Sequence, residues 1–149
     1  MGITGRNLEK STVALISKNT IMKGASGDEL SFITSPRQAC QVLEVGVTIT
    51  KDHDTSLNGE TIWECKVYDK NNESGVQIAT ATFAASSVAG DEKTTRDGSF
   101  AWVSAYENAS DRIFAKGARI VMHMTQPSGD NADIFAPYVI AIPNGAEPL

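Results

Sequence analysis

Hydrophobic and polar residues alternate along several short stretches of this chain. Between residues 41 and 50 the apolar positions of the alternation are Leu43, Val45, Val47 and Ile49. Successive side chains of a β-strand point to opposite sides of the sheet, so a period of two predicts a strand with one buried face. The stretch from 61 to 69 repeats the pattern, and an Asn-Gly step between the two stretches favours a turn.

Other stretches carry the same signal. Strands are expected at 76–84, 100–106, 118–125 and 134–142, with shorter ones at 11–17 and 29–34. Pro137 has no backbone N–H to donate, which predicts that the last strand lies at a sheet edge or carries a bulge. Helical signals are short and confined to 35–38 and 109–116.

About eight short strands and few helical residues indicate an all-β protein. A single sheet would leave one apolar face in water, so we expect a single antiparallel β-sandwich, with a jelly roll preferred over an immunoglobulin-like order. No internal repeat or linker divides the chain. We therefore expect an extended N-terminal arm, residues 1–10, followed by one sandwich domain, residues 11–149.

Two segments are candidates for contact with a partner. The stretch from 88 to 98 is polar and is expected to be a long mobile loop. Its candidate contact residues are Asp91, Lys93 and Arg96. The N-terminal arm is the other segment, because chain ends can become ordered on a partner. Its candidate contact residues are Ile3, Arg6 and Leu8.

The charge distribution excludes some classes of partner. Thirteen basic and eighteen acidic residues give a net charge of -5, and the basic residues are scattered. Without a basic stripe, direct binding to nucleic acid is not expected. No stretch approaches the roughly 20 apolar residues of a membrane span, and the first ten residues lack the apolar core of a signal peptide. Neither membrane insertion nor export by that route is expected.

Residues that could support catalysis or bind a metal are few. A catalytic triad needs a histidine base, and both His53, in a polar loop, and His123, in a strand, fit ordinary structural positions. The acidic segments 52–60 and 129–133 lack the spacing of a calcium loop. Cys40 and Cys65 fit reduced core residues, with a disulfide as the alternative. We expect no enzyme activity, no cofactor and no metal.

The aromatic residues leave two interpretations open. Trp63 and Trp102 lie in alternating stretches, which favours a place in the core. An exposed platform that stacks against sugars is the alternative. Tyr68 and Tyr106 lie near strand ends and are candidate surface contacts.

Three features of the chain carry a resemblance to a known class of protein. They are a short polar arm at residues 1–8, a strand pattern rich in Thr, Val and Ala, and a segment at 113–121 that looks like the turn-into-strand element of jelly-roll domains. In these features the chain resembles the decoration, or cement, proteins on the outer capsid of tailed bacteriophages.

The resemblance implies a non-enzymatic virion protein that is assembled in the host cytoplasm. Such a protein binds major capsid protein subunits on the outer surface of the head and stabilises the lattice. It also implies a homo-oligomer, with a trimer as one form. A carbohydrate- or receptor-binding sandwich domain of a phage fibre or adhesin is the alternative. An exposed aromatic platform would favour that alternative, and burial of Trp63 and Trp102 would favour capsid binding.

Overall fold

A computed structural model describes the strands and most of the central part of the chain. The described residues are 15–16, 22–23, 29–34, 39–51, 60–69, 72–84, 86–125 and 134–143. The arm expected at residues 1–10 lies outside them, and so do its candidate contacts Ile3, Arg6 and Leu8. His53 and the helical turn expected at 35–38 also lie outside the described residues.

The described residues form eleven β-strands and two short 3₁₀ turns, with no α-helix among them. The strands are β1 (Leu15–Ile16), β2 (Met22–Lys23), β3 (Glu29–Thr34), β4 (Cys40–Lys51), β5 (Thr61–Asp69), β6 (Asn72–Phe83), β7 (Glu92–Thr94), β8 (Ala101–Trp102), β9 (Ile113–Phe114), β10 (Arg119–Thr125) and β11 (Ile134–Pro143). The turns are η1 (Ser104–Tyr106) and η2 (Ala109–Arg112). The expected all-β class is confirmed.

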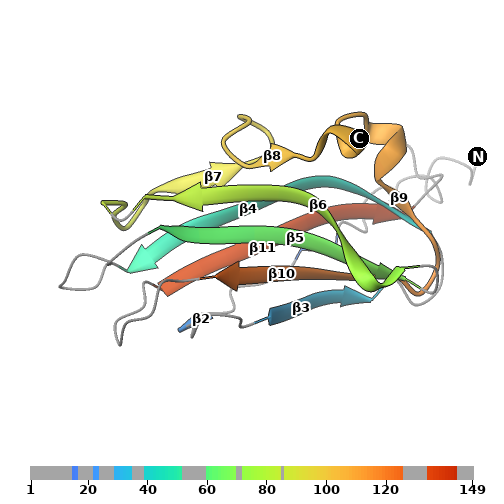
Figure 1. Ribbon diagram of the computed structural model, residues 1–149, viewed down its shortest axis with the longest axis horizontal. Helices are drawn as coiled ribbons and strands as arrows, with labels where there is room; N and C mark the ends of the chain where they lie inside the picture. The colour runs from blue at the N-terminus through green and yellow to red at the C-terminus, as the bar shows by residue number, and fades with distance from the viewer. Residues whose placement is uncertain are drawn as a thin grey trace, which may run out of the picture.

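The strands form two antiparallel sheets that pack face to face (Figure 1). The six-stranded sheet has the order β1-β11-β4-β7, with β2 also on β11 and β9 also on β4. The five-stranded sheet has the order β3-β10-β5-β6-β8. The antiparallel β-sandwich predicted from the alternation is therefore confirmed.

The strand pairing identifies the sandwich as a jelly roll. If β1 and β2 are taken as one interrupted strand, the first strand pairs with the last, β11. Moving inward, β3 pairs with β10, β4 with β7, and β5 with β6. One long antiparallel hairpin rolled into two sheets produces this nested pairing, which distinguishes the jelly roll from other sandwiches. The short strands β8 and β9 are additions between β7 and β10.

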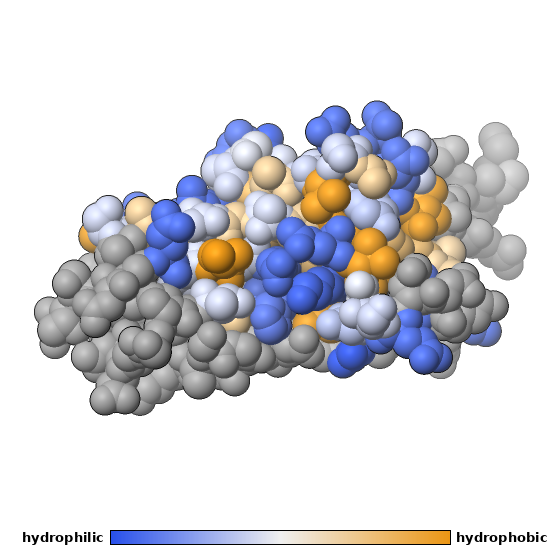
Figure 2. Space-filling view, viewed as in Figure 1, coloured by the Kyte–Doolittle hydropathy of each residue, from blue (hydrophilic) through white to orange (hydrophobic). Residues whose placement is uncertain are grey.

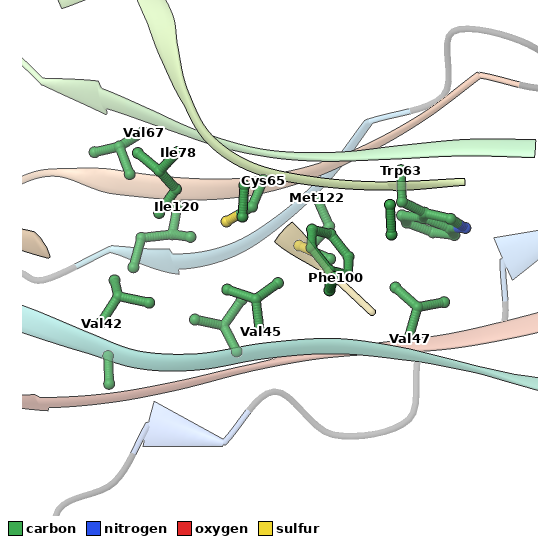
Figure 3. Close-up of a cluster of buried hydrophobic side chains, with 14 of the residues drawn as sticks. Val42, Val45, Val47, Trp63, Cys65, Val67, Ile78, Phe100, Ile120 and Met122 are labelled. Carbon is green, nitrogen blue, oxygen red and sulfur yellow. The ribbon is translucent and has the colours of Figure 1, made fainter. Parts of the chain in front are cut away.

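Side chains from both sheets fill the space between them. Figure 3 shows valines of β4 facing Trp63, Cys65 and Val67 of β5 across this space. Phe135 of β11 lies between Trp63 and Phe83, with ring centroids 5.4 and 5.5 Å away. Aromatic rings in tilted or edge-on contact contribute stability beyond the apolar area they bury.

The strand predicted at 61–69 is confirmed in its bounds and in its buried face. Trp63, Cys65 and Val67 are buried in β5, and the residues between them are partly or fully exposed. The predicted hairpin with the next strand is also present. β6 begins at Asn72 rather than at residue 76, so the hairpin connection is shorter than expected.

β4 departs from the regular alternation predicted for it. Its pairing with β11 leaves Leu43 as an extra residue between Val42 and Glu44. An extra residue of this kind is a β-bulge, which reverses the side to which the following residues point. Val42 and Val45 are therefore both buried, whereas Leu43 is exposed. The prediction that Leu43 shares the buried face is wrong.

Pro137 predicted that the last strand lies at a sheet edge or carries a bulge. Two register shifts, at Ile134/Phe135 and at Ile140/Ala141, interrupt the pairing of β11 with β4, but β11 is not an edge strand. It lies between β4 on one side and the short strands β1 and β2 on the other. β1 pairs at Ile140 and Ala141, and β2 pairs at Ile134 and Phe135. Pro137 lies between the β11 residues that pair with β1 and those that pair with β2.

The stretch from 88 to 98 is not the single long loop that its polarity predicted. Its middle forms β7, which pairs with β4. Ile49 N–H donates to the Asp91 carbonyl oxygen and Thr95 N–H to that of Val45, each at 2.9 Å. The β7 sequence Glu-Lys-Thr has no apolar alternation, so nothing in the hydrophobic pattern marks it as a strand.

The stretch from 100 to 106 is a strand only at β8. Beyond β8 the chain forms η1 and η2 and then enters β9, which belongs to the other sheet. The helical turn predicted at 109–116 is present but ends at Arg112. This crossing connects the two sheets along one side of the sandwich.

Arg112 holds the crossing in place. Its guanidinium donates to the carbonyl oxygens of Val42 (3.1 Å), Tyr106 (3.0 Å) and Glu107 (2.9 Å). Its Cζ lies 4.1 Å from the ring centroid of Trp102. The planar guanidinium carries five N–H donors, so one side chain can serve several carbonyls and still stack on an indole.

Candidate docking surface

Three apolar side chains neighbour one another on the outer face of the six-stranded sheet. β9 places Ile113 opposite Gln41, and Leu43 lies two residues further along β4, diagonal to Ile113. On the other side of β4, β11 places Ile140 opposite Glu44. Leu43 and Ile113 are 37% and 39% exposed, and Ile140 is half-buried. We call Leu43, Ile113 and Ile140 the apolar patch.

The apolar patch is a consequence of the bulge in β4. Without the extra residue, Leu43 would point into the core with Val45. Bulges often redirect a side chain toward a functional surface. Adjacent apolar side chains gain free energy when a partner removes them from water. This face is therefore a candidate for docking.

A polar cluster borders the apolar patch on the same face. The Tyr138 hydroxyl donates to Glu44 Oε1 at 2.6 Å and lies 3.5 Å from Glu92 Oε1. Arg96 Nη2 lies 3.2 Å from Glu44 Oε1, and the side chains of Arg96 and Glu44 are 71% and 17% exposed. We call Glu44, Glu92, Arg96 and Tyr138 the polar cluster. It presents charges of both signs beside the apolar patch.

Gly46 makes room for the ring of Tyr138. The two residues lie opposite each other on β4 and β11, and a Cβ at Gly46 would collide with the Tyr138 ring. Burial raises the pKa of Tyr138, and its hydrogen bond to Glu44 raises it further. The phenol therefore remains a neutral hydrogen-bond donor across the physiological pH range.

The three candidate contacts between residues 88 and 98 have different roles. Asp91 is exposed, but its Oδ2 accepts a hydrogen bond from Val88 N–H at 2.9 Å and closes a turn. Lys93 is half-buried, and its Nζ lies 5.6 Å from the centroid of the Phe83 ring. Arg96 is the one of the three that joins the polar cluster.

The two candidate tyrosines lie away from the polar cluster. Tyr68 is half-buried on the outer face of the five-stranded sheet, with Arg119 Cζ 4.8 Å from its ring centroid. Tyr106 is half-buried in η1, and its ring centroid lies 6.1 Å from that of Phe114. The structure therefore distributes the described candidate residues over several surfaces rather than into one site.

The opposite face of the molecule has a different distribution of hydrophobic and hydrophilic residues. Figure 2 views the outer side of the five-stranded sheet, where hydrophilic residues occupy the middle and hydrophobic residues stand apart from one another. Glu64 and Lys66 of β5 form an ion pair of 3.3 Å. Ile62, at the start of β5, is 38% exposed. It therefore matches Leu43 in exposure while lying on the other sheet.

No aromatic side chain that the structure describes is exposed. Trp63 is fully buried, which confirms its predicted place in the core. Trp102 is half-buried at the edge of the core, with Arg112 over its ring. Stacking on a sugar requires an open ring face. The aromatic side chains whose exposure the structure describes therefore offer half-buried rings at most.

The remaining reactive groups occupy structural positions. Cys40 and Cys65 are buried and are not bonded to each other, as expected for reduced core residues. Burial raises the pKa of the Cys65 thiol, which keeps it protonated. His123 is half-buried in β10, with Nε2 3.4 Å from Thr125 Oγ1.

The described residues lack two kinds of feature. They contain no group of three His, Cys, Asp or Glu side chains placed to hold a metal ion. Nor do they include a helix of the length and apolarity that crossing a membrane requires.

Comparison with known proteins finds a likeness among solved structures. The chain matches no protein-family model and no curated protein. Among solved structures it is similar to a chain in the structure of the infectious bursal disease virus Gx strain, with a TM-score of 0.41 and 14% sequence identity. The similarity covers 93% of this chain and 34% of that chain, so this chain spans about a third of that chain's length.

The sequence pattern did not identify the residues that dominate this face. Tyr138 and Glu44 are separated by 94 positions along the chain. Their contact depends on the register between β4 and β11, which the alternation of either strand alone does not specify. The same register places Tyr138 over Gly46, and an isolated glycine in a strand pattern is the one available signal of such close approach.

Proposed function

We propose that this protein is a non-enzymatic virion structural protein that binds the outer surface of a capsid. The observation that carries the proposal is the apolar patch, which a bulge turns outward beside the polar cluster. Covering Leu43 and Ile113 removes apolar surface from water and drives association. The exposed Arg96 and Glu92 supply charges of both signs that can fix the orientation of the partner.

The finer proposal is a decoration protein of a tailed bacteriophage, and it rests on the sequence resemblance. In this role the chain binds major capsid protein subunits and increases the stability of the assembled head. A protein that binds only the assembled lattice stabilises it by an amount that rises with its free concentration relative to Kd. Contacts by the arm residues Ile3, Arg6 and Leu8, or by a homo-oligomer, would raise the effective affinity through multivalency.

Sedimentation with capsids tests this proposal. Purified protein mixed with undecorated capsids should sediment with them and give icosahedrally ordered density on the outer surface by cryo-electron microscopy. Failure to sediment at high protein excess would reject capsid binding.

Matched variants test the proposed face. Leu43→Asp combined with Ile113→Asp should weaken binding roughly a hundredfold, because two apolar contacts are replaced by charges that must be desolvated. Ile62→Asp is the control, since Ile62 is similarly exposed but lies on the other sheet. If Ile62→Asp weakens binding as much as the double variant, the docking face is assigned to the wrong sheet.

A carbohydrate- or receptor-binding role is the competing proposal. The described aromatic side chains do not favour it, because each one whose exposure is described is buried or half-buried rather than exposed. Reproducible binding on a glycan array, together with no binding to capsids, would replace the capsid proposal with this one.

A further inference from the structure

The segment from Thr94 to Phe100 forms a closed loop beside the polar cluster. Phe100 N–H donates to the Thr94 carbonyl oxygen at 3.0 Å, and both end residues are buried. Between them lies the dipeptide Asp97-Gly98. Gly98 has φ +80°, a left-handed conformation that residues with a Cβ rarely adopt. The backbone therefore favours glycine directly after Asp97.

An aspartate followed by glycine is chemically labile. The backbone nitrogen of the glycine can attack the aspartate carboxyl carbon, and glycine has no side chain to hinder the approach. The ring that forms opens in two ways, and one of them leaves an isoaspartate, whose backbone runs through the side-chain carbon. Asp97-Gly98 combines this sequence with an exposed position on the surface.

Ser99 holds the Asp97 carboxylate through two hydrogen bonds. Asp97 Oδ1 accepts from Ser99 N–H at 2.8 Å and from Ser99 Oγ–H at 2.5 Å. The serine hydroxyl is fixed in turn, because its oxygen accepts from Thr94 N–H at 3.0 Å. Asp97 N–H donates to Thr94 Oγ1 at 3.3 Å. Both the carboxylate and the backbone of Asp97 are therefore tied to the ends of the loop.

We infer that Asp97-Gly98 is a latent site of isoaspartate formation and that Ser99 suppresses the reaction in the folded protein. The reaction begins when Gly98 N bonds to Asp97 Cγ. The amide proton and a carboxyl OH leave together as one water molecule and give a succinimide. Water then adds to the main-chain carbonyl carbon of Asp97, and its bond to Gly98 N breaks. The product is isoaspartate of unchanged mass, without any oxidant or reductant.

Ser99 opposes this reaction in two ways. Its hydrogen bonds lower the pKa of Asp97, so less of the protonated carboxyl that loses water is present near neutral pH. They also hold the carboxylate oxygen on Ser99, which restricts the rotation of the Asp97 side chain through which Cγ approaches Gly98 N. Isomerisation would insert an additional backbone carbon beside Arg96 and disturb its ion pair with Glu44.

Ageing the folded protein tests the inference independently of any capsid. The wild-type protein and a peptide of residues 92–102 are incubated at neutral pH, and isoaspartate at position 97 is measured by electron-transfer mass spectrometry. The folded protein should form it at least roughly tenfold more slowly, because charged hydrogen bonds are stronger than neutral ones. Equal rates in the protein and the peptide would overturn the inference without any variant being needed.

Two substitutions assign the protection to the Ser99 hydroxyl. Ser99→Ala should raise the rate at position 97 several-fold, whereas Ser99→Thr keeps a hydroxyl and should remain near the wild-type rate. Circular dichroism and the urea midpoint establish that each variant is folded. A rate for folded Ser99→Ala equal to that of the wild type would also overturn the role of Ser99.

Discussion

At the scale of single residues, Arg112 makes several contacts that a substitution would remove. It is buried, it serves three carbonyl oxygens, and it covers Trp102. Burial lowers the pKa of the guanidinium, which still lies far above neutral, so a charge is held at the side of the sandwich. The hydrogen bonds offset its desolvation and join β4 to the crossing segment.

Replacement of Arg112 should therefore be costly. Arg112→Leu leaves three carbonyl groups without their donor and should lower the free energy of unfolding by about 3 kcal/mol. Arg112→Lys keeps the charge but not the fork of donors, so it should lower the free energy of unfolding by a smaller amount. Arg96→Ala is the control, because an exposed ion pair contributes less than about 1 kcal/mol. Similar urea midpoints for Arg112→Leu and Arg96→Ala would contradict this account.

Tyr138 should make the fold sensitive to high pH. Its pKa is raised in the folded state above the ordinary value of 10.0, so the unfolded chain loses the phenol proton first. The stabilising contribution is complete below about pH 10 and declines as the pH rises further. Between about pH 8 and pH 10.5, the urea midpoint of the wild type should fall more than that of Tyr138→Phe. Equal decreases in the urea midpoints of the wild type and Tyr138→Phe would contradict a raised pKa of Tyr138.

At the scale of single elements, β4 combines a buried strand with a local interruption. The bulge at Leu43 lets one twelve-residue strand present valines to the core on both sides of the irregularity. It also turns a leucine outward, on the face that carries Ile113 and Ile140. The bulge thus keeps the valines on both sides of it in the core and adds Leu43 to the candidate docking surface.

Two alanine substitutions in β4 test the bulge. A regular alternation makes Leu43 and Val45 equivalent, whereas the structure buries only Val45. Val45→Ala should lower the free energy of unfolding by about 2 kcal/mol, through lost burial and a residual cavity. Leu43→Ala should cost less than about 1 kcal/mol. Equal losses in urea unfolding would indicate that β4 is regular and that Leu43 is buried.

At the scale of the whole molecule, the jelly roll places its two cysteines on opposite sheets. Cys40 begins β4 and Cys65 lies in the middle of β5, and both are buried in the same core. The nested pairing joins strands that are distant in sequence, so neither sheet is complete without residues from both halves of the chain. We expect the sandwich to unfold cooperatively rather than strand by strand.

Thiol labelling tests this expectation. In native buffer, both cysteines should react with a disulfide reagent orders of magnitude more slowly than a free thiol, because burial protects them and raises the pKa of Cys65. In denaturant, two thiols per chain should react at once. Rapid labelling of either cysteine in the native protein would indicate that its part of the core is open.

Much of the fold follows from local patterns in the sequence. The strand at 61–69 could be predicted in its bounds and its buried face, because Trp63, Cys65 and Val67 alternate with polar residues at its centre. The core position of Trp63 followed from the same alternation. β7 could not be predicted in this way, since its stability comes from backbone hydrogen bonds to β4 rather than from an apolar face.

The sequence by itself determined that the chain forms strands, which side of most strands is apolar, and that basic residues are scattered along the chain. Only the tertiary structure decided that Leu43 points outward, that Tyr138 lies over Gly46 beside Glu44, and that the sheets have jelly-roll order. The physical reason is that alternation acts between neighbouring residues, whereas bulges, register and strand order depend on pairing between distant segments.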